Sequence, residues 1–202
     1  ENFQVGDALA NSLRGSKKLH VVTGYSGLQT MLKIVSRFSV DLNDIKLYFG
    51  NEPSTPSHRL NKVSTKSLDE EAIEYWLENG ISPVRCHDVM KVIELIDNGK
   101  LKAFFHNNKD GRKNLHAKVY CTDEYVISGS SNFSNLGLYQ SREFNFRFPI
   151  DSHEYSAAKG FIDWCDFNST DYTEKFRDIL DKLLAIVGWE EALSRSIYAL
   201  TE

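Results

Sequence analysis

Apolar residues along the chain recur with two different spacings that alternate. Short runs rich in β-branched and aromatic residues alternate with longer stretches in which an apolar residue returns every three or four positions. The first pattern predicts strands at 17–25, 45–50, 100–106, 114–121, 124–129 and 142–148. The second predicts helices at 26–38, 68–80 and 89–99, with two or three more within 152–199.

These interleaved elements predict an α/β fold, with a mixed β-sheet that carries helices on both faces. The segment 51–65 holds two of the four prolines and is expected to be a long loop. At 202 residues the chain has the size of one substantial domain.

The composition narrows the kinds of partner the chain can have. Its net charge of −4, with 26% charged residues, excludes a uniformly basic nucleic-acid coat, so a polyanion must bind a local patch. Cys86, Cys121 and Cys165 are widely spaced and predict reduced, buried thiols in a cytoplasmic protein. No apolar run approaches the roughly 20 residues of a membrane span, and no membrane partner is expected.

The candidate chemistry lies in the segment 114–132. On a strand, His116 and Lys118 stand two positions apart and point to the same face, while Val119 and Cys121 point to the opposite, apolar face. An imidazole and an ammonium group side by side, with no carboxylate in contact, suit a phosphate. No metal site and no cofactor are expected with them.

The following strand runs into the sequence GSSN at 129–132. Gly129 lets the backbone approach a ligand closely, and Ser130 and Asn132 supply neutral hydrogen-bond donors. A short helix opened by FSNLGL would add free N–H groups that favour an anion. A lone histidine or a lone GSSN is usually structural, but the combination at strand–turn–strand spacing favours a phosphate site.

Charge near this segment favours a polyanionic substrate. Between positions 106 and 118, four basic residues stand against one aspartate, a net +3 in a net-acidic chain. Three of them, Lys109, Arg112 and Lys113, are candidate DNA-binding residues in the turn before the site. Tyr25, at the carboxyl end of a predicted strand, is a candidate for stacking on a base.

These residues resemble a known family. The sequence HAKVYCTD fits the HxKx4D motif of the phospholipase D superfamily at His116, Lys118 and Asp123, and GSSN is similar to the GSxN segment that follows it. Glu143 falls where related nucleases keep a glutamate. The wider sequence resembles the nuclease domain of NgoFVII/BfiI-type restriction endonucleases, and the phospholipase D-like domain of defence helicases.

The resemblance implies a phospholipase D-like nuclease fold with one HxKx4D motif per chain. It implies a catalytic domain over 1–165, with C-terminal helices over 166–202 that pack on it and lead to a DNA-recognition or helicase domain outside this chain. One histidine would attack phosphorus to form a phosphohistidine, and a second would protonate the leaving oxygen. Lys118, Ser130 and Asn132 would stabilise the phosphate oxygens.

A single motif and two required histidines predict a homodimer whose two copies of His116 share one phosphate. Glu143 is expected to hydrogen-bond an imidazole nitrogen, and Asp123 to brace the strand turn.

Three functions remain open. The first is a metal-independent endodeoxyribonuclease of a bacterial or archaeal restriction or phage-defence system, acting on double-stranded DNA with a recognition domain or helicase subunit. The second is a lipid phosphodiesterase or phosphatidyltransferase, although such relatives usually carry two motifs in one chain. The third is an inactive DNA-binding or dimerisation module of a larger helicase. We favour the first, because a binding module has no need of an imidazole nucleophile.

Overall fold

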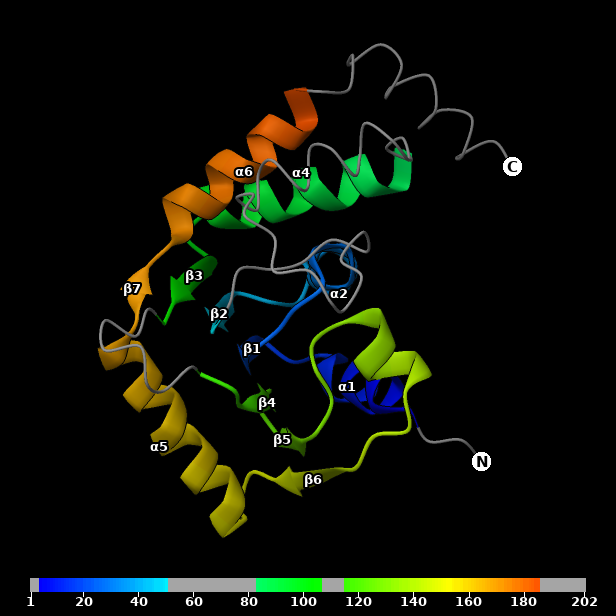
Figure 1. The fold of residues 1–202 in the computed structure, drawn as a ribbon, viewed down its shortest axis with the longest axis vertical. Coiled ribbons are helices and arrows are strands. Elements are labelled where there is room, and N and C mark those ends of the chain that lie inside the picture. The colour runs from blue at the N-terminus through cyan, green and yellow to red at the C-terminus, as the bar shows by residue number, and fades with distance from the viewer. Residues whose placement is uncertain (1–3, 51–82, 107–114, 186–202) are drawn as a thin grey trace, which may run out of the picture.

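The computed structural model describes residues 4–50, 83–106 and 115–185 (Figure 1). The loop predicted at 51–65 and the helix predicted at 68–80 lie outside these residues. Within them, seven strands form one sheet in the order β6-β5-β4-β1-β2-β3-β7. No helix in this part of the chain is long and apolar enough to cross a membrane.

The sheet is mixed, as predicted. Three strands run parallel to one another: β1 (Lys18–Thr23), β2 (Asp44–Phe49) and β3 (Leu101–Phe105). The others pair antiparallel with their neighbours: β4 (Lys118–Cys121), β5 (Tyr125–Gly129), β6 (Asn145–Pro149) and the two-residue β7 (Thr170–Asp171). Long crossovers join the parallel strands, whereas β4, β5 and β6 follow one another directly along the chain.

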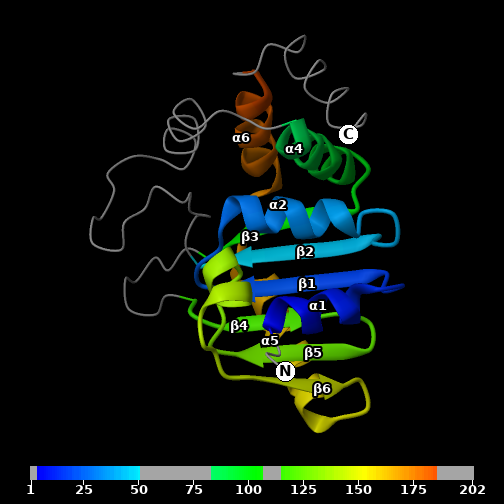
Figure 2. The same cartoon turned by 90° about the vertical axis from the view of Figure 1, so that its right-hand side faces the viewer.

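The strand register aligns the ends of four strands at one edge of the sheet. Phe105 pairs with Phe49, Phe49 with Thr23, and Thr23 with Lys118. The carboxyl ends of the three parallel strands therefore meet the beginning of β4 (Figure 2). We call this row the site edge.

Helices cover both faces of the sheet, but unequally (Figure 1). One face carries α1 (Val5–Leu13), α2 (Leu28–Arg37), α4 (Pro83–Asp97), α6 (Thr173–Ala185) and the short π-helix η1 (Leu136–Gln140). The other carries α5 (His153–Asn168). Side chains of β2 alternate between the two hydrophobic cores. Leu47 and Phe49 face the core under α1, α2, α4 and α6, whereas Tyr48 faces the core under α5.

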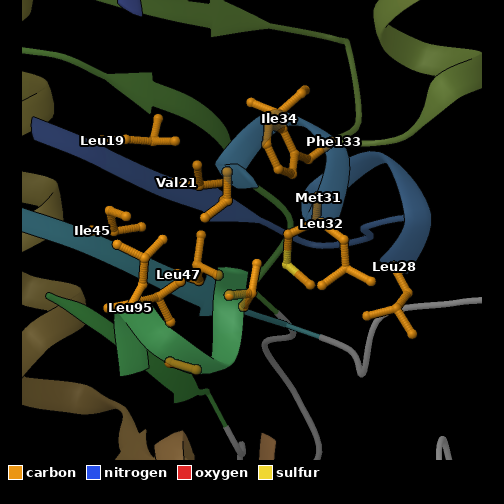
Figure 3. Close-up of a cluster of buried hydrophobic side chains, with 14 of the residues drawn as sticks. Leu19, Val21, Leu28, Met31, Leu32, Ile34, Ile45, Leu47, Leu95 and Phe133 are labelled. Atoms are coloured by element: carbon orange, nitrogen blue, oxygen red, sulfur yellow. The ribbon is translucent and has the colours of Figure 1, made fainter. Parts of the chain in front are cut away.

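The larger core is built from side chains whose spacing in the sequence matches their element. Figure 3 shows Leu19 and Val21 of β1 and Leu47 of β2 against Leu28 and Met31 of α2. The positions in α2 follow the three-to-four spacing that predicted this helix at 26–38, and burying them stabilises each side chain by about 1.5–3 kcal/mol.

Several predicted boundaries were wrong. The strand predicted from 114 begins at Lys118 and the strand predicted from 142 begins at Asn145, because pairing with the neighbouring strand starts only there. The helix predicted from 89 begins six residues earlier, and its added first turns bury Cys86. Proline is tolerated in the first turn of a helix, where its missing N–H needs no partner.

Candidate phosphate site

Two glycines at the site edge hold the main chain that carries His116. The backbone oxygen of Leu115 would lie 2.8 Å from a Cβ at Gly24 and 2.1 Å from a Cβ at Gly50. The Gly24 amide also donates a 3.1 Å hydrogen bond to the carbonyl of Ala117. Neither glycine was a candidate from the sequence, although each lies at the end of a predicted strand, the position at which such a contact could have been suspected.

His116 precedes β4 and is exposed, yet its side chain lies beside that of Lys118. Lys118 Nζ is 3.0 Å from Nδ1 and 3.1 Å from Nε2 of His116, and it donates a 2.9 Å hydrogen bond to the His116 carbonyl. Each ring nitrogen of His116 forms hydrogen bonds in the plane of the ring, and the two nitrogens point in different directions. Lys118 Nζ is almost equidistant from both nitrogens, so it cannot lie along either direction. The ammonium therefore neighbours the ring without aligning with the in-plane direction of either nitrogen.

Lys118 itself is buried, with 8% of its surface exposed. Burial lowers the pKa of its ammonium group below the ordinary value, and the nearby charge of Glu143 offsets part of this effect. The opposite face of β4 is apolar, as predicted, because Val119 and Cys121 pack in the core under α5. All three cysteines are buried, also as predicted, and they are not joined in disulfides.

Ser130 and Glu143 are bound to each other. The Ser130 hydroxyl donates to Glu143 Oε2 and accepts a 3.0 Å hydrogen bond from the Phe144 amide. A serine hydroxyl has one hydrogen, so in this arrangement it has none for a phosphate oxygen. Within the chain Glu143 thus binds a hydroxyl, whereas the sequence had led us to expect an imidazole.

Asn132 differs from Ser130 in having a side-chain oxygen without a partner in the described part of the chain. Its Oδ1 is buried and has no hydrogen-bond partner among the described residues. The amide of Ser134 binds its carbonyl at 2.8 Å, and the missing side chain of Gly137 leaves room for its backbone. The predicted short helix exists as η1. Two of its amides are already bound within the chain, because Ser134 accepts the amide of Gly137 at its hydroxyl and that of Leu138 at its carbonyl. These two amides are therefore not available to an anion.

Gly129 and Asp123 serve the framework. A Cβ at Gly129 would lie 2.3 Å from the Phe144 carbonyl oxygen, so the close approach comes from the chain entering β6 and not from a ligand. Asp123 lies at the far end of β4, where its carboxylate accepts hydrogen bonds from the Lys17 amide at 2.6 Å and the Ser16 hydroxyl at 3.2 Å. It ties the β4–β5 turn to the segment before β1, away from His116.

Tyr25 stands beside the site and is 51% exposed. Its ring meets that of His116 edge-on, with centroids 6.3 Å apart. The other three DNA-binding candidates, Lys109, Arg112 and Lys113, lie outside the described residues. Within those residues, no three His, Cys, Asp or Glu side chains gather closely enough to hold a metal ion.

Chemically, the site presents one exposed imidazole and one buried cation at the carboxyl ends of the parallel strands. Such a set can bind a phosphate group and offer it a nitrogen nucleophile.

Known proteins resemble this chain in structure and not in sequence. No family model and no curated protein matches the sequence. NucT from Helicobacter pylori superposes with a TM-score of 0.50 at 12% identity, over 82% of this chain and 89% of that one. Phosphatidylserine synthase from Haemophilus influenzae superposes with a TM-score of 0.53 at 15% identity, over 94% of this chain but 44% of that one.

A third structure, Nuc from Salmonella typhimurium, a phospholipase D family member, has a TM-score of 0.47 at 13% identity, over 82% of this chain and 89% of that one. The two higher scores show that the chain shares the fold of NucT and of phosphatidylserine synthase, a mixed sheet flanked by helices.

Proposed function

We propose that the chain is a phosphodiesterase of the phospholipase D superfamily and that it cleaves DNA. The observation that carries the proposal is the contact between the buried Lys118 ammonium and the exposed His116 ring, within an HxKx4D sequence. The shared fold with NucT and phosphatidylserine synthase supports the superfamily.

In the first step, a ring nitrogen of His116 attacks phosphorus. An N–P bond forms, and the P–O bond to the leaving strand breaks. The leaving oxygen takes a proton from the imidazolium of a second His116. Lys118 and the Asn132 amide neutralise the charge that builds on the non-bridging oxygens. The cation takes the place that a Lewis acid fills in metal-dependent phosphodiesterases, so we propose that cleavage needs no metal ion.

In the second step, water attacks the phosphohistidine. It gives a proton to the neutral second imidazole, and the N–P bond breaks, which restores both histidines to their starting states. The charge of Glu143 favours the charged form of Lys118. Glu143 also accepts the Ser130 hydroxyl, so this serine acts as part of the frame.

We propose that the second histidine comes from a second copy of the chain. Of the other described histidines, His20 pairs with Asp44 at the start of β2, His87 lies in α4, His153 begins α5, and His106 follows β3 at the site edge. His58 lies outside the described residues.

The His106 ring packs against Trp164 of α5, with ring centroids 5.4 Å apart, whereas Lys118 shares the opposite face of the sheet with Tyr120. The His106 ring is therefore turned away from the Lys118 side of the sheet, and a two-fold axis near His116 would supply the second imidazole instead.

DNA is the proposed substrate because of the groups around the site. Tyr25 offers an exposed ring beside His116, and the basic residues at 109, 112 and 113 precede the site in sequence. The resemblance to NgoFVII/BfiI-type enzymes supports a role in a cytoplasmic restriction or phage-defence system, with a recognition domain or helicase as partner.

Lipid headgroup transfer is the second candidate. It is favoured by the structural likeness to phosphatidylserine synthase, which extends over 94% of this chain.

Purified protein incubated with plasmid in excess EDTA separates these functions. We expect cleavage that survives chelation, disappears in His116→Ala and leaves a phosphorylated histidine after a denaturing alkaline quench. Cleavage that stops on chelation would contradict the metal-independent reaction. Hydrolysis of phosphatidylserine vesicles without DNA cleavage would favour the lipid enzyme, and inertness towards both would favour a binding module.

A further inference from the structure

Ser131, which lies between Ser130 and Asn132 in the GSSN segment, is held at three of its atoms. Asn145 Nδ2 donates a 2.9 Å hydrogen bond to its hydroxyl, and its amide donates a 3.3 Å hydrogen bond to Asn145 Oδ1. The hydroxyl of Tyr120 donates to its carbonyl oxygen. Ser131 is fully buried and does not face the site, so these bonds serve its position.

The two partners of Ser131 come from the strands on either side of β5. Tyr120 lies in β4 two residues after Lys118 and shares its face. This face therefore presents Lys118 and Tyr120 from the strand, and His116 from the residues just before it. Asn145 begins β6 and pairs with Gly129. A Cβ at Gly129 would lie 2.5 Å from Asn145 Oδ1. The absence of a side chain at Gly129 therefore makes room for the Asn145 side chain to reach Ser131.

The surroundings make this arrangement rigid. Tyr120 is buried, and its ring packs against Phe133 with centroids 5.4 Å apart. Phe133 is itself anchored, because its carbonyl accepts a 2.9 Å hydrogen bond from the Gly27 amide. Burial raises the pKa of the Tyr120 phenol well above its ordinary range, which favours the protonated form that donates this hydrogen bond.

We infer that Tyr120 and Asn145 are positioning residues that act through Ser131. They fix the backbone on both sides of Ser131, and thereby hold Asn132 at the distance from His116 and Lys118 that the phosphate requires. This inference rests on the proposed phosphodiesterase function. A displacement of about 1 Å in such a site can lower the rate by about 100-fold.

The test uses Tyr120→Phe, which removes one oxygen atom, and Asn145→Ala. In single-turnover cleavage of an oligonucleotide duplex in EDTA, we expect phosphohistidine formation to slow by about 10-fold in the first variant and 10- to 100-fold in the second. The Kd for DNA should change by less than about 3-fold, since neither residue touches the substrate. The double variant should be no slower than about the slower single variant, because both act through one residue.

Tyr155→Phe is the matched control. The Tyr155 hydroxyl also donates to a backbone carbonyl, that of Thr122 at 2.7 Å, but at the far end of β4. It should lower Tm to a similar extent as Tyr120→Phe and leave the cleavage rate unchanged.

Equal rates for Tyr120→Phe and Tyr155→Phe would overturn the inference while wild-type cleavage upholds the proposed function. Failure of the wild-type protein to cleave would overturn both. If Asn145→Ala does not fold, the single-atom change at Tyr120 decides the matter alone.

Discussion

The Lys118 ammonium lies against the ring of His116, 3.0 and 3.1 Å from its two nitrogens, although the histidine precedes the strand that carries the lysine. The two side chains touch because alternation of faces extends past the end of the hydrogen-bonded strand, where Gly24 and Gly50 support the chain. The predictions below follow from this contact and from the groups around it.

Lys118→Ala should reduce phosphodiester cleavage nearly as much as His116→Ala, by about 1,000-fold, because a buried cation aimed at the developing charge is lost. Initial rates of plasmid nicking in EDTA measure this effect. Lys18→Ala is the control: Lys18 is half-buried and its Nζ binds the Tyr155 hydroxyl at 2.8 Å, at the opposite edge of the sheet. A Lys118→Ala enzyme within about 10-fold of wild type would show that the ammonium is dispensable.

The pH dependence of phosphohistidine hydrolysis should report the protonation of Lys118, because in this step the second histidine acts as a neutral base and leaves no alkaline limb of its own. Burial lowers the Lys118 pKa, so the hydrolysis rate should fall as pH rises through a value below the ordinary 10.5. Glu143 opposes this shift, and Glu143→Gln should therefore move the alkaline limb to lower pH. Profiles of the single-turnover hydrolysis rate for the two proteins test the sign of the shift. A limb that stays in place or moves to higher pH would contradict the assigned role of Glu143.

Gly24→Ala should impair cleavage by displacing the backbone beside His116, since the new Cβ would lie 3.0 Å from the His116 Cα. We expect about a 100-fold loss in kcat with DNA binding retained. Gly160→Ala makes the same chemical change in the middle of α5, where no atom lies within 4 Å of the new Cβ. It should stabilise the protein by about 0.5–1 kcal/mol and leave kcat unchanged. Similar rates for the two variants would refute the steric argument.

Subunit mixing tests whether two chains share one phosphate. If each active site needs His116 from both copies, a mixed dimer of wild-type and His116→Ala chains should be inactive. Refolding equal amounts together should then leave about a quarter of the activity of a wild-type dimer population at the same total concentration. Half of the activity would indicate that each chain works independently, and sedimentation of an active monomer would dismiss the shared site.

Stability at low pH should depend on Asp166, which links α5 to the sheet through Lys46 Nζ at 2.7 Å and the Tyr48 hydroxyl at 2.5 Å. Burial alone would raise its pKa, but these two hydrogen bonds reverse the shift and hold the pKa below the ordinary 3.8. The stabilisation is therefore complete above pH 3.8 and is lost as pH falls through the folded-state pKa.

Asp166→Asn should cost about 1–2 kcal/mol at pH 7. Its Tm should also change less than that of wild type between pH 5 and the acid limit. Parallel Tm profiles for the two proteins would show that the carboxylate does not contribute in this way.

The sequence alone determined the features that depend on local periodicity. Alternation at a period of two placed His116 and Lys118 on one face and Val119 and Cys121 on the other. Apolar residues spaced three or four apart located the helix at 26–38, observed as α2. Both periods follow from backbone geometry within a few residues, so no knowledge of the rest of the fold is needed.

Only the tertiary structure decided which distant groups meet. Ser130 was expected to bind phosphate and Glu143 an imidazole, yet the two bind each other across 13 positions in the chain. Gly24 and Gly50 come to lie against Leu115, and Asn145 reaches Ser131 past Gly129. These contacts arise from strand order and register. Those are set by the packing of whole layers, a property that no local pattern of residues contains.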